Sequence, residues 1–156
     1  MYIELHARSA FSFLEGASLP EELIAVCAQF KQPAMALLDT DGIYGAPRFH
    51  LAADKAKIKA HIGAEISATI NSPQRHRDTE KNRIIRKQEL LSSVPPCLRG
   101  EFRLALLVAS RPVYQNLCRL ITKMKLRAKK GEGAVTAQEL EEHAEGLICL
   151  TGGAEG

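Results

Sequence analysis

Five side chains that can bind a metal ion or move a proton lie in or shortly after predicted strands of this sequence: His6, Glu15, Asp39, Asp41 and Glu65. An imidazole nitrogen together with carboxylate oxygens suits Zn²⁺ or Mn²⁺. In parallel α/β sheets, ligands bind beyond the carboxyl ends of the strands, so these side chains would share one edge. The alternative is structural: Asp39 and Asp41 would cap a turn, and Glu65 would pair with Arg8.

A second chemical feature is a run of positive charge. Between residues 119 and 130 there are six basic and no acidic side chains: Arg119, Lys123, Lys125, Arg127, Lys129 and Lys130. Such a run can follow a phosphate backbone through salt-sensitive, sequence-independent contacts. The alternative is a solvated helix end, where the helix dipole favours cations. No aromatic residue interrupts the run, so stacking on single-stranded bases is not indicated.

Predicted strands and helices alternate along the chain, and these elements must position the residues named above. Short apolar runs predict strands at residues 2–5, 34–38, 62–70, 102–109 and 147–150. Helical spacing predicts helices that start at Ser18 and run to about residue 30, and at residues 47–59, 112–128 and 136–144, with capping signals at Ser18 and at Thr136 with Glu139. This order is typical of an α/β fold with parallel strands and flanking helices. Residues 71–100 are basic and proline-containing, which predicts a loop or insertion.

Composition limits the class of protein. The chain has 156 residues, 46% hydrophobic and 25% charged, with a formal net charge of +3. One globular domain with its own core is expected at this length. No apolar run approaches the roughly 20 residues of a membrane span, and no secretory signal opens the chain. The cysteines form no CxxC pair, so we expect reduced thiols and a cytoplasmic protein: Cys27, Cys97, Cys118 and Cys149.

Several stretches resemble one family in register. Residues 5–17 (LHARSAFSFLEGA) resemble the opening of the PHP (polymerase and histidinol phosphatase) domain, in the version found at the N-terminus of bacterial C-family, polymerase III alpha-like DNA polymerases. Residues 36–45 (ALLDTDGIYG) and 62–65 (IGAE) resemble the second and third motifs of that domain. Residues 115–121, 142–148 and 150–153 are most similar to the error-prone branch. The resemblance covers nearly the whole chain except residues 71–100.

The chain departs from the metal-binding members of this family at two positions. The family's first motif is His-x-His, whereas His6 is followed here by Arg8; a His normally stands between the two aspartates of the second motif, where this chain has Thr40. Glu15 replaces the usual Asp. A guanidinium stays protonated and repels a cation, so we expect Arg8 to pair with Glu65 or Asp41 in place of a metal. Hydrolysis by metal-activated water is then expected to be lost.

The resemblance implies a fold, a function and partners. Residues 1–156 would form the N-terminal portion of a PHP-type (β/α) barrel, with further barrel strands and the polymerising carboxylates beyond Gly156. The parent polymerase would extend DNA with Mg²⁺ in replication and damage-tolerant repair, and this portion would be a non-catalytic support without a cofactor of its own. Expected partners are the remainder of the polymerase chain, DNA, and other replication or translesion proteins, with no membrane.

Two other functions stay open. The first is a metal-dependent phosphoesterase or proofreading hydrolase, with the five side chains named first as ligands of Zn²⁺ or Mn²⁺. The second is an interaction module that docks DNA or a protein through the basic run. Arg8 and Thr40 argue against the hydrolase.

Overall fold

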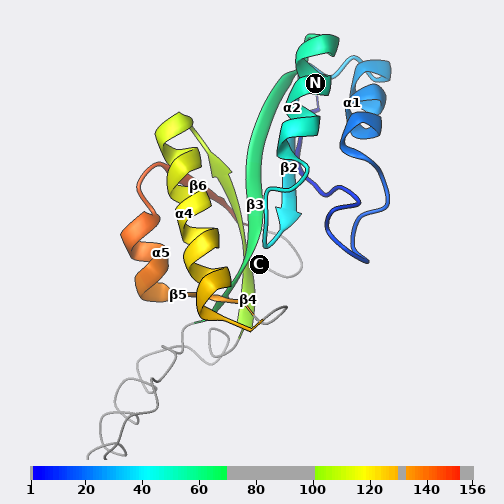
Figure 1. Cartoon of the computed structure of the whole chain (residues 1–156). Helices are drawn as coiled ribbons and strands as arrows, with labels where there is room; N and C mark the ends of the chain where they lie inside the picture. Colours follow the sequence, from blue (N-terminus) through cyan, green and yellow to red (C-terminus); the bar gives the residue numbers. More distant parts are fainter. Residues whose placement is uncertain (1, 70–100, 130–132, 152–156) are drawn as a thin grey trace, which may run out of the picture.

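The computed structural model describes residues 2–69, 101–129 and 133–151, which form one curled sheet with helices packed against it (Figure 1). The strands are β1 (Glu4–Ala7), β2 (Ala34–Thr40), β3 (Lys59–Thr69), β4 (Glu101–Val108), β5 (Val135–Thr136) and β6 (Leu147–Leu150). Their order is β1-β2-β3-β4-β6, and β5 pairs with β3. The α/β class and the partial barrel expected from the sequence are confirmed.

Strand direction differs from the expectation in one half of the sheet. β1, β2 and β3 are parallel, and β5 is parallel to β3, as expected. β4 is antiparallel to β3, and β6 is antiparallel to β4, so the prediction of a wholly parallel sheet was wrong there. Thr69 at the end of β3 is opposite Glu101 at the start of β4. The chain therefore re-enters the sheet at the end it left, whereas parallel pairing needs a crossover to the opposite end. The predicted insertion at residues 71–100 lies outside the described residues.

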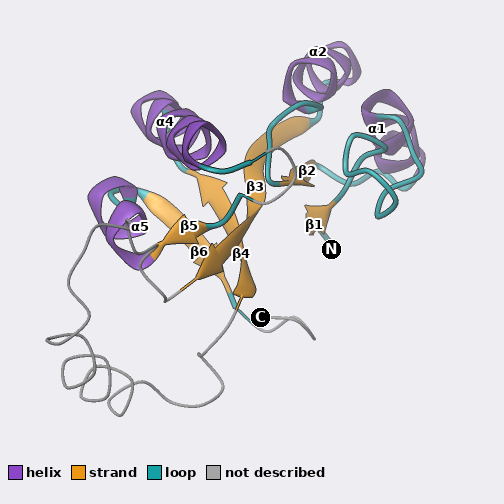
Figure 2. Cartoon of the chain, turned by 60° about the horizontal axis from the view of Figure 1, so that its bottom comes forward, coloured by secondary structure: helices purple, strands orange, loops and turns teal. Residues whose placement is uncertain are grey.

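In the described part of the chain, four helices cover one face of the sheet: α1 (Pro20–Gln29), α2 (Ala46–Ala56), α4 (Arg111–Arg127) and α5 (Ala137–His143). Figure 2 shows them ranged around the outer, convex side of the strands. The described part of the chain places no helix on the concave face. Side chains on that face therefore lie within the curl of the sheet.

Helix starts follow local hydrogen bonding. In α5 the predicted capping box is confirmed: Glu139 N donates to Thr136 Oγ1 at 3.2 Å, and Thr136 N donates to Glu139 Oε2 at 3.0 Å. In α1 the prediction of Ser18 as the cap was wrong. The N-cap is Leu19, whose N–H donates to the Glu22 carboxylate at 2.8 Å. Because Pro20 needs no N–H partner in the first turn, the helix begins directly at that residue.

Helix α2 ends earlier than predicted, and β3 starts earlier. Lys57 adopts a left-handed conformation with φ of 58°, which terminates the helix at Ala56. The chain then enters β3 at Lys59, so His61 lies within the strand and not before it.

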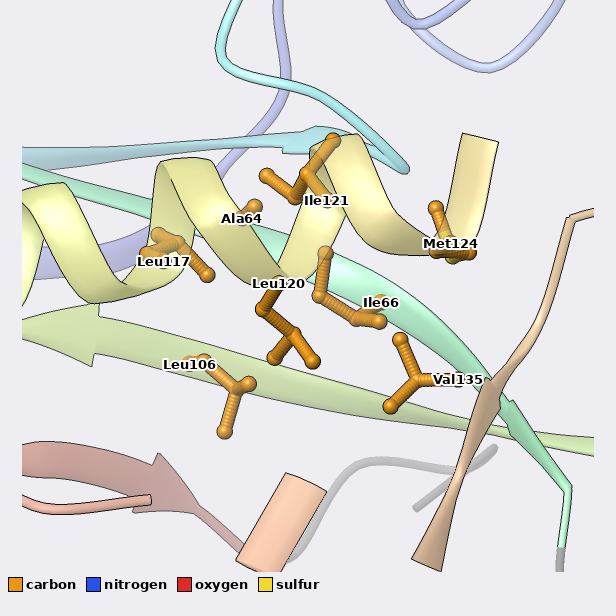
Figure 3. Close-up of a cluster of buried hydrophobic side chains, with 8 residues drawn as sticks. All are labelled: Ala64, Ile66, Leu106, Leu117, Leu120, Ile121, Met124 and Val135. Atoms are coloured by element: carbon orange, nitrogen blue, oxygen red, sulfur yellow. The ribbon is translucent and has the colours of Figure 1, made fainter. Parts of the chain in front are cut away.

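The largest core cluster joins α4 to the sheet. Figure 3 shows Leu117, Leu120 and Met124 of α4 over Ile66 and Leu106 of β3 and β4. All five are at most 2% exposed. At about 25 cal/mol per Å² of buried apolar area, such a cluster stabilises the docking of α4 strongly. A second cluster joins α1 and α2 to β2, and a third lies on the concave face around Leu38.

Two general expectations can be compared with the described residues. None of the described helices is long and apolar enough to cross a membrane. Cys27, Cys118 and Cys149 are free thiols, and burial raises the pKa of Cys27. Cys97 lies outside the described residues.

Candidate functional site

Asp39 fixes the loop that follows β1. Its Oδ1 accepts hydrogen bonds from Ser9 N at 2.9 Å, Ser9 Oγ at 2.8 Å and Ser12 Oγ at 2.9 Å. Its Oδ2 accepts from Gly45 N at 3.0 Å. The residue is 1% exposed, so four protein donors replace the water that a buried carboxylate has lost. Asp39 lies within β2 and does not cap a turn, although its role is structural.

Asp41 faces β3. It has a left-handed φ of 49°, and its carboxylate accepts from Ser67 N at 2.7 Å and from Ser67 Oγ at 3.0 Å. Its own N–H donates to the Glu65 carbonyl at 2.7 Å. These bonds hold the chain beyond β2 against its parallel neighbour. Arg8 and Asp41 do not form the ion pair that was one of the two alternatives.

The other alternative, an ion pair between Arg8 and Glu65, is confirmed. Arg8 Nη2 lies 2.5 Å from Glu65 Oε2, and Arg8 Nη1 lies 3.5 Å from Glu15 Oε2. The Glu65 side chain is 4% exposed and the Arg8 side chain 26%. His6 Nε2 lies 3.7 Å from the same Glu65 oxygen. A permanent cation therefore lies between two of the predicted ligand carboxylates.

Glu15 is held by Arg103, a residue outside the predicted ligand set. Arg103 of β4 donates from Nη1 to Glu15 Oε2 at 2.9 Å and from Nη2 to Oε1 at 2.6 Å. Thr40 Oγ1 also donates to Oε2, at 2.7 Å. Hydrogen bonds from Arg103, and next from Thr40, hold the pKa of Glu15 below its ordinary value. The signal that could have found Arg103 is its positive charge inside the otherwise apolar run at residues 102–109.

The structure thus brings together three of the five predicted ligands and places two elsewhere. Glu65, Glu15 and His6 lie at one mouth of the curl beside Arg8, Thr40 and Arg103, whereas Asp39 and Asp41 are engaged with serine donors. The described residues include no group of three or more His, Cys, Asp or Glu placed to hold one ion. The guanidinium of Arg8 stays protonated at ordinary pH, and its positive charge repels a divalent cation. These residues do not fit a catalytic metal.

One detail of the ion pair matters for its strength. Glu65 Oε2 is buried and accepts no well-aligned hydrogen bond, although Arg8 Nη2 is close to it. The contact is therefore chiefly a charge interaction in a partly dehydrated site. Removing the cation would leave a buried carboxylate oxygen without compensation.

The basic run divides into two groups. Lys123 Nζ pairs with Glu142 Oε2 at 2.5 Å, and Arg127 Nη2 donates to Glu139 Oε2 at 2.9 Å and to the Ala134 carbonyl at 2.6 Å. These two residues tie α4 to α5. Three others are exposed, namely Arg119, Lys125 and Lys129, and Lys130 lies outside the described residues.

The class of protein follows from this geometry: part of an α/β barrel domain whose mouth is occupied by ion pairs. The PHP domain family model matches residues 4–156, and the chain belongs to the PHP domain family.

Related proteins extend this assignment. An error-prone DNA polymerase of Anaeromyxobacter sp. (strain K) is 34% identical over 168 residues, which include 99% of this chain and 12% of that protein. The error-prone DNA polymerase of Bdellovibrio bacteriovorus is 31% identical over 96% of this chain and 12% of its own length. The chain is therefore homologous to the PHP region of these proteins and spans only about an eighth of their length.

A solved structure shows the same fold. A protein from Bifidobacterium adolescentis, provisionally assigned as a metal-dependent phosphoesterase, superposes with a TM-score of 0.50 at 14% identity. The match covers 80% of this chain and 34% of that chain. The likeness supports the barrel-type architecture of the fold alone.

Proposed function

We propose that this chain acts as a non-catalytic structural support at the N-terminus of an error-prone DNA polymerase. The parent enzyme would extend DNA from nucleoside triphosphates with Mg²⁺ during replication and damage-tolerant repair, in the cytoplasm. The homology to error-prone polymerases over 99% of the chain supports this context.

The observation that carries the non-catalytic role is the position of Arg8. Its guanidinium lies 2.5 Å from the carboxylate of Glu65 and within ion-pair distance of Glu15. A metal-dependent hydrolase needs an ion to lower the pKa of bound water, and Arg8 supplies its charge without that chemistry. The same charge joins the loop after β1 to β3, so the mouth is held together by the protein itself.

The edges of the sheet favour a partner in the same polypeptide. β1 and β6 end the strand order of the described residues, and each carries a half-exposed apolar side chain, Leu5 at 39% and Ile148 at 51%. Unpaired edges with apolar side chains favour association with another segment. The remainder of the polymerase chain is the partner we propose for them. DNA and other replication or translesion proteins would be reached through that parent protein.

Two measurements test the proposal. A full-length polymerase that carries this segment at its N-terminus is compared with the same protein lacking residues 1–156. We expect deletion to lower the melting temperature and the yield of folded enzyme, together with primer extension. Unchanged stability and extension would overturn the supporting role.

The second measurement addresses the hydrolase. The 156-residue chain is incubated with Mn²⁺ or Zn²⁺ and phosphomonoester, phosphodiester or 3′-mismatched primer substrates, beside the variant Glu65→Gln. We expect the unsubstituted chain to release no more phosphate or nucleotide than the Glu65→Gln variant does. Release that depends on metal and on Glu65 would overturn the non-catalytic role and favour the phosphoesterase or proofreading function.

A further inference from the structure

The loop between β1 and α1 carries an apolar tip, formed by Phe13 and Leu14. Phe13 is 84% exposed, and Leu14, at 92%, is the most exposed large apolar side chain in the described part of the chain. The loop, blue in Figure 1, projects beside the end of β2. Single apolar side chains scattered over a surface are normal. Here two large ones are adjacent and point into solvent from one loop.

Hydrogen bonds on both sides of the tip hold this loop in one conformation. The Ser12 carbonyl accepts from Glu15 N and from Gly16 N, both at 2.9 Å. Ser12 Oγ donates to the buried carboxylate of Asp39 at 2.9 Å. On the other side, Glu15 is bound by Arg103 of β4, as described above. The tip is therefore preorganised, so little conformational entropy remains to be lost when it binds.

The backbone of Leu14 is itself unusual. Its φ of 64° lies in the left-handed region, which is unfavourable for a bulky side chain without a local hydrogen bond. The other described non-glycine residues with positive φ are polar, namely Lys31, Asp41 and Lys57. An asparagine at position 14 would suit both this backbone and the solvent. Strain and exposure thus coincide at a leucine, a combination that points to a contact made by its side chain.

The size of the tip limits what can bind it. Two side chains of this size offer roughly 300 Å² of apolar surface, so two copies of the chain meeting tip to tip would bury about 600 Å² in total. Stable interfaces between separate proteins bury roughly 1,200–2,000 Å². A segment of the same polypeptide needs less area, because the covalent connection gives it a high effective concentration. The tip therefore suits a tethered partner better than a second copy.

We propose that Phe13 and Leu14 insert into an apolar pocket in the part of the parent polymerase that follows residue 156. The error-prone polymerases that are similar to this chain match it over only 12% of their length, so most of such a polypeptide is available to supply the pocket. This inference rests on the supporting role proposed above. It adds to the sheet edges a second contact, at the end of the fold where β2 finishes.

The first test identifies what covers the tip. In the full-length polymerase with primer–template DNA, Phe13 is replaced by the photoreactive residue p-benzoylphenylalanine, and the cross-links formed on irradiation are mapped by mass spectrometry. We expect a cross-link within one polypeptide, from position 13 to a segment beyond residue 156. Cross-linked dimers would assign the tip to a second copy, and cross-linked DNA would assign it to nucleic acid. Either result, or cross-links confined to residues 1–156, would overturn the proposal.

The second test compares one double variant, Phe13→Ser with Leu14→Asn, in two proteins. In the 156-residue chain we expect a melting temperature that is unchanged or higher, because both side chains are exposed and asparagine tolerates the left-handed backbone. In the full-length polymerase we expect primer extension to be lost at least about tenfold faster on heating, since truncating buried large apolar side chains is destabilising. A lower melting temperature of the 156-residue chain, or an unchanged rate of loss in the polymerase, would overturn the proposal.

A matched control is the double variant Phe30→Ser with Lys31→Asn. Phe30 is 69% exposed and Lys31 has a φ of 53°, but this pair follows α1 and precedes β2, so it lies away from the tip. We expect it to change heat inactivation of the polymerase little, and a loss equal to that of the tip variant would overturn the site. Deletion of residues 1–156 separates this inference from the supporting role. If deletion destabilises the polymerase and the tip variant does not, the tip does not dock and the supporting role stands; if deletion has no effect, both fail.

Discussion

Arg8 Nη2 and Glu65 Oε2 lie 2.5 Å apart, joining the loop after β1 to the buried face of β3. The resemblance of the sequence motifs led us to expect metal ligands at this mouth. Here a side chain with a fixed positive charge lies between carboxylates, so the charge that organises the mouth belongs to the polypeptide. The consequences of this substitution for stability and for metal binding can both be measured.

Replacing Arg8 should destabilise the fold. In Arg8→Gln the 4%-exposed carboxylate of Glu65 loses its close cation, and breaking a buried pair from one side leaves an uncompensated charge. Because Arg8 is itself partly exposed, we expect a loss of about 2 kcal/mol in the free energy of unfolding, measured by urea denaturation. The control is Arg48→Gln, whose pair with Glu21 is exposed on both sides. That variant should change stability much less, because an exposed ion pair contributes little, and equal effects would refute a special role for Arg8.

Restoring the family's imidazoles should restore metal binding. The double variant Arg8→His with Thr40→His removes the guanidinium and adds two nitrogen ligands beside His6, Glu15 and Glu65. Imidazole and carboxylate suit Zn²⁺ and Mn²⁺. We expect about one ion per chain after dialysis, measured by mass spectrometry of the metal, against none above background in the unsubstituted chain. A tightly held ion in the unsubstituted chain would contradict our interpretation of Arg8.

Much of the architecture was accessible from local patterns. The apolar run at residues 34–38 predicted the centre of β2, and helical spacing predicted the helix at residues 112–128 that the structure has as α4. These predictions succeeded because burial of one stripe or one strand is encoded by periodicity within a short window. The Thr136–Glu139 cap was equally local.

What could not be predicted depended on contacts between distant residues. The direction of β4 is set by where the chain returns after residue 69, which periodicity does not encode. The role of Arg103 depends on meeting Glu15, 88 residues away in sequence. Residue type suggested either a metal ligand or a turn cap for Asp39, but Ser9, Ser12 and Gly45 supply donors that let it stay buried in a strand.

Glu15 should give the stability of the protein a measurable pH dependence. Its pKa is lowered in the folded state by Arg103 and then Thr40, below the ordinary value of 4.5. A depressed carboxyl pKa contributes stability that is present above the unfolded value and is lost as pH falls through the folded one. Glu15→Gln should therefore lower the melting temperature at pH 7, and the difference from the unsubstituted chain should shrink as pH falls below about 4.5.

The control for this pH series is Glu141→Gln, an exposed carboxyl of α5 that is in none of the ion pairs described above. It should shift the melting temperature little at any pH. If the difference between Glu15→Gln and the unsubstituted chain stays constant from pH 7 to pH 3, the ion pair with Arg103 does not contribute as the structure indicates.

Replacing Asp39 should lower the free energy of unfolding more than the small change in its side chain suggests. In Asp39→Asn an amide nitrogen replaces one of two oxygens that accept from four donors, so at least one donor faces another donor. An unsatisfied buried group costs about 1–3 kcal/mol. We expect that loss in urea denaturation, with faster hydrogen exchange at the amides of Ser9 and Gly45. Asp54→Asn, an exposed position of α2, should leave both measurements unchanged.

The two groups of basic residues in α4 predict different effects on any binding of DNA. Arg119 and Lys125 are exposed and outside the ion pairs to α5, so their charges are available to phosphates. If this helix contacts DNA, the double variant Arg119→Gln with Lys125→Gln should weaken duplex binding and lower the slope of log affinity against log salt by about 1–2. Fluorescence anisotropy across a salt series measures both quantities.

Lys123→Gln is the matched control for this helix, because its ammonium already meets Glu142 at 2.5 Å. It should change DNA affinity less than the double variant does. Loss of Lys123 leaves the Glu142 carboxylate without its partner, but that charge lies on α5. Arg127→Gln should act on stability, because Arg127 joins Glu139 and the Ala134 carbonyl to α4. Binding that is undetectable, or independent of salt, would remove DNA as a ligand of this surface and leave α4 with its packing roles, against β3 and β4 and against α5.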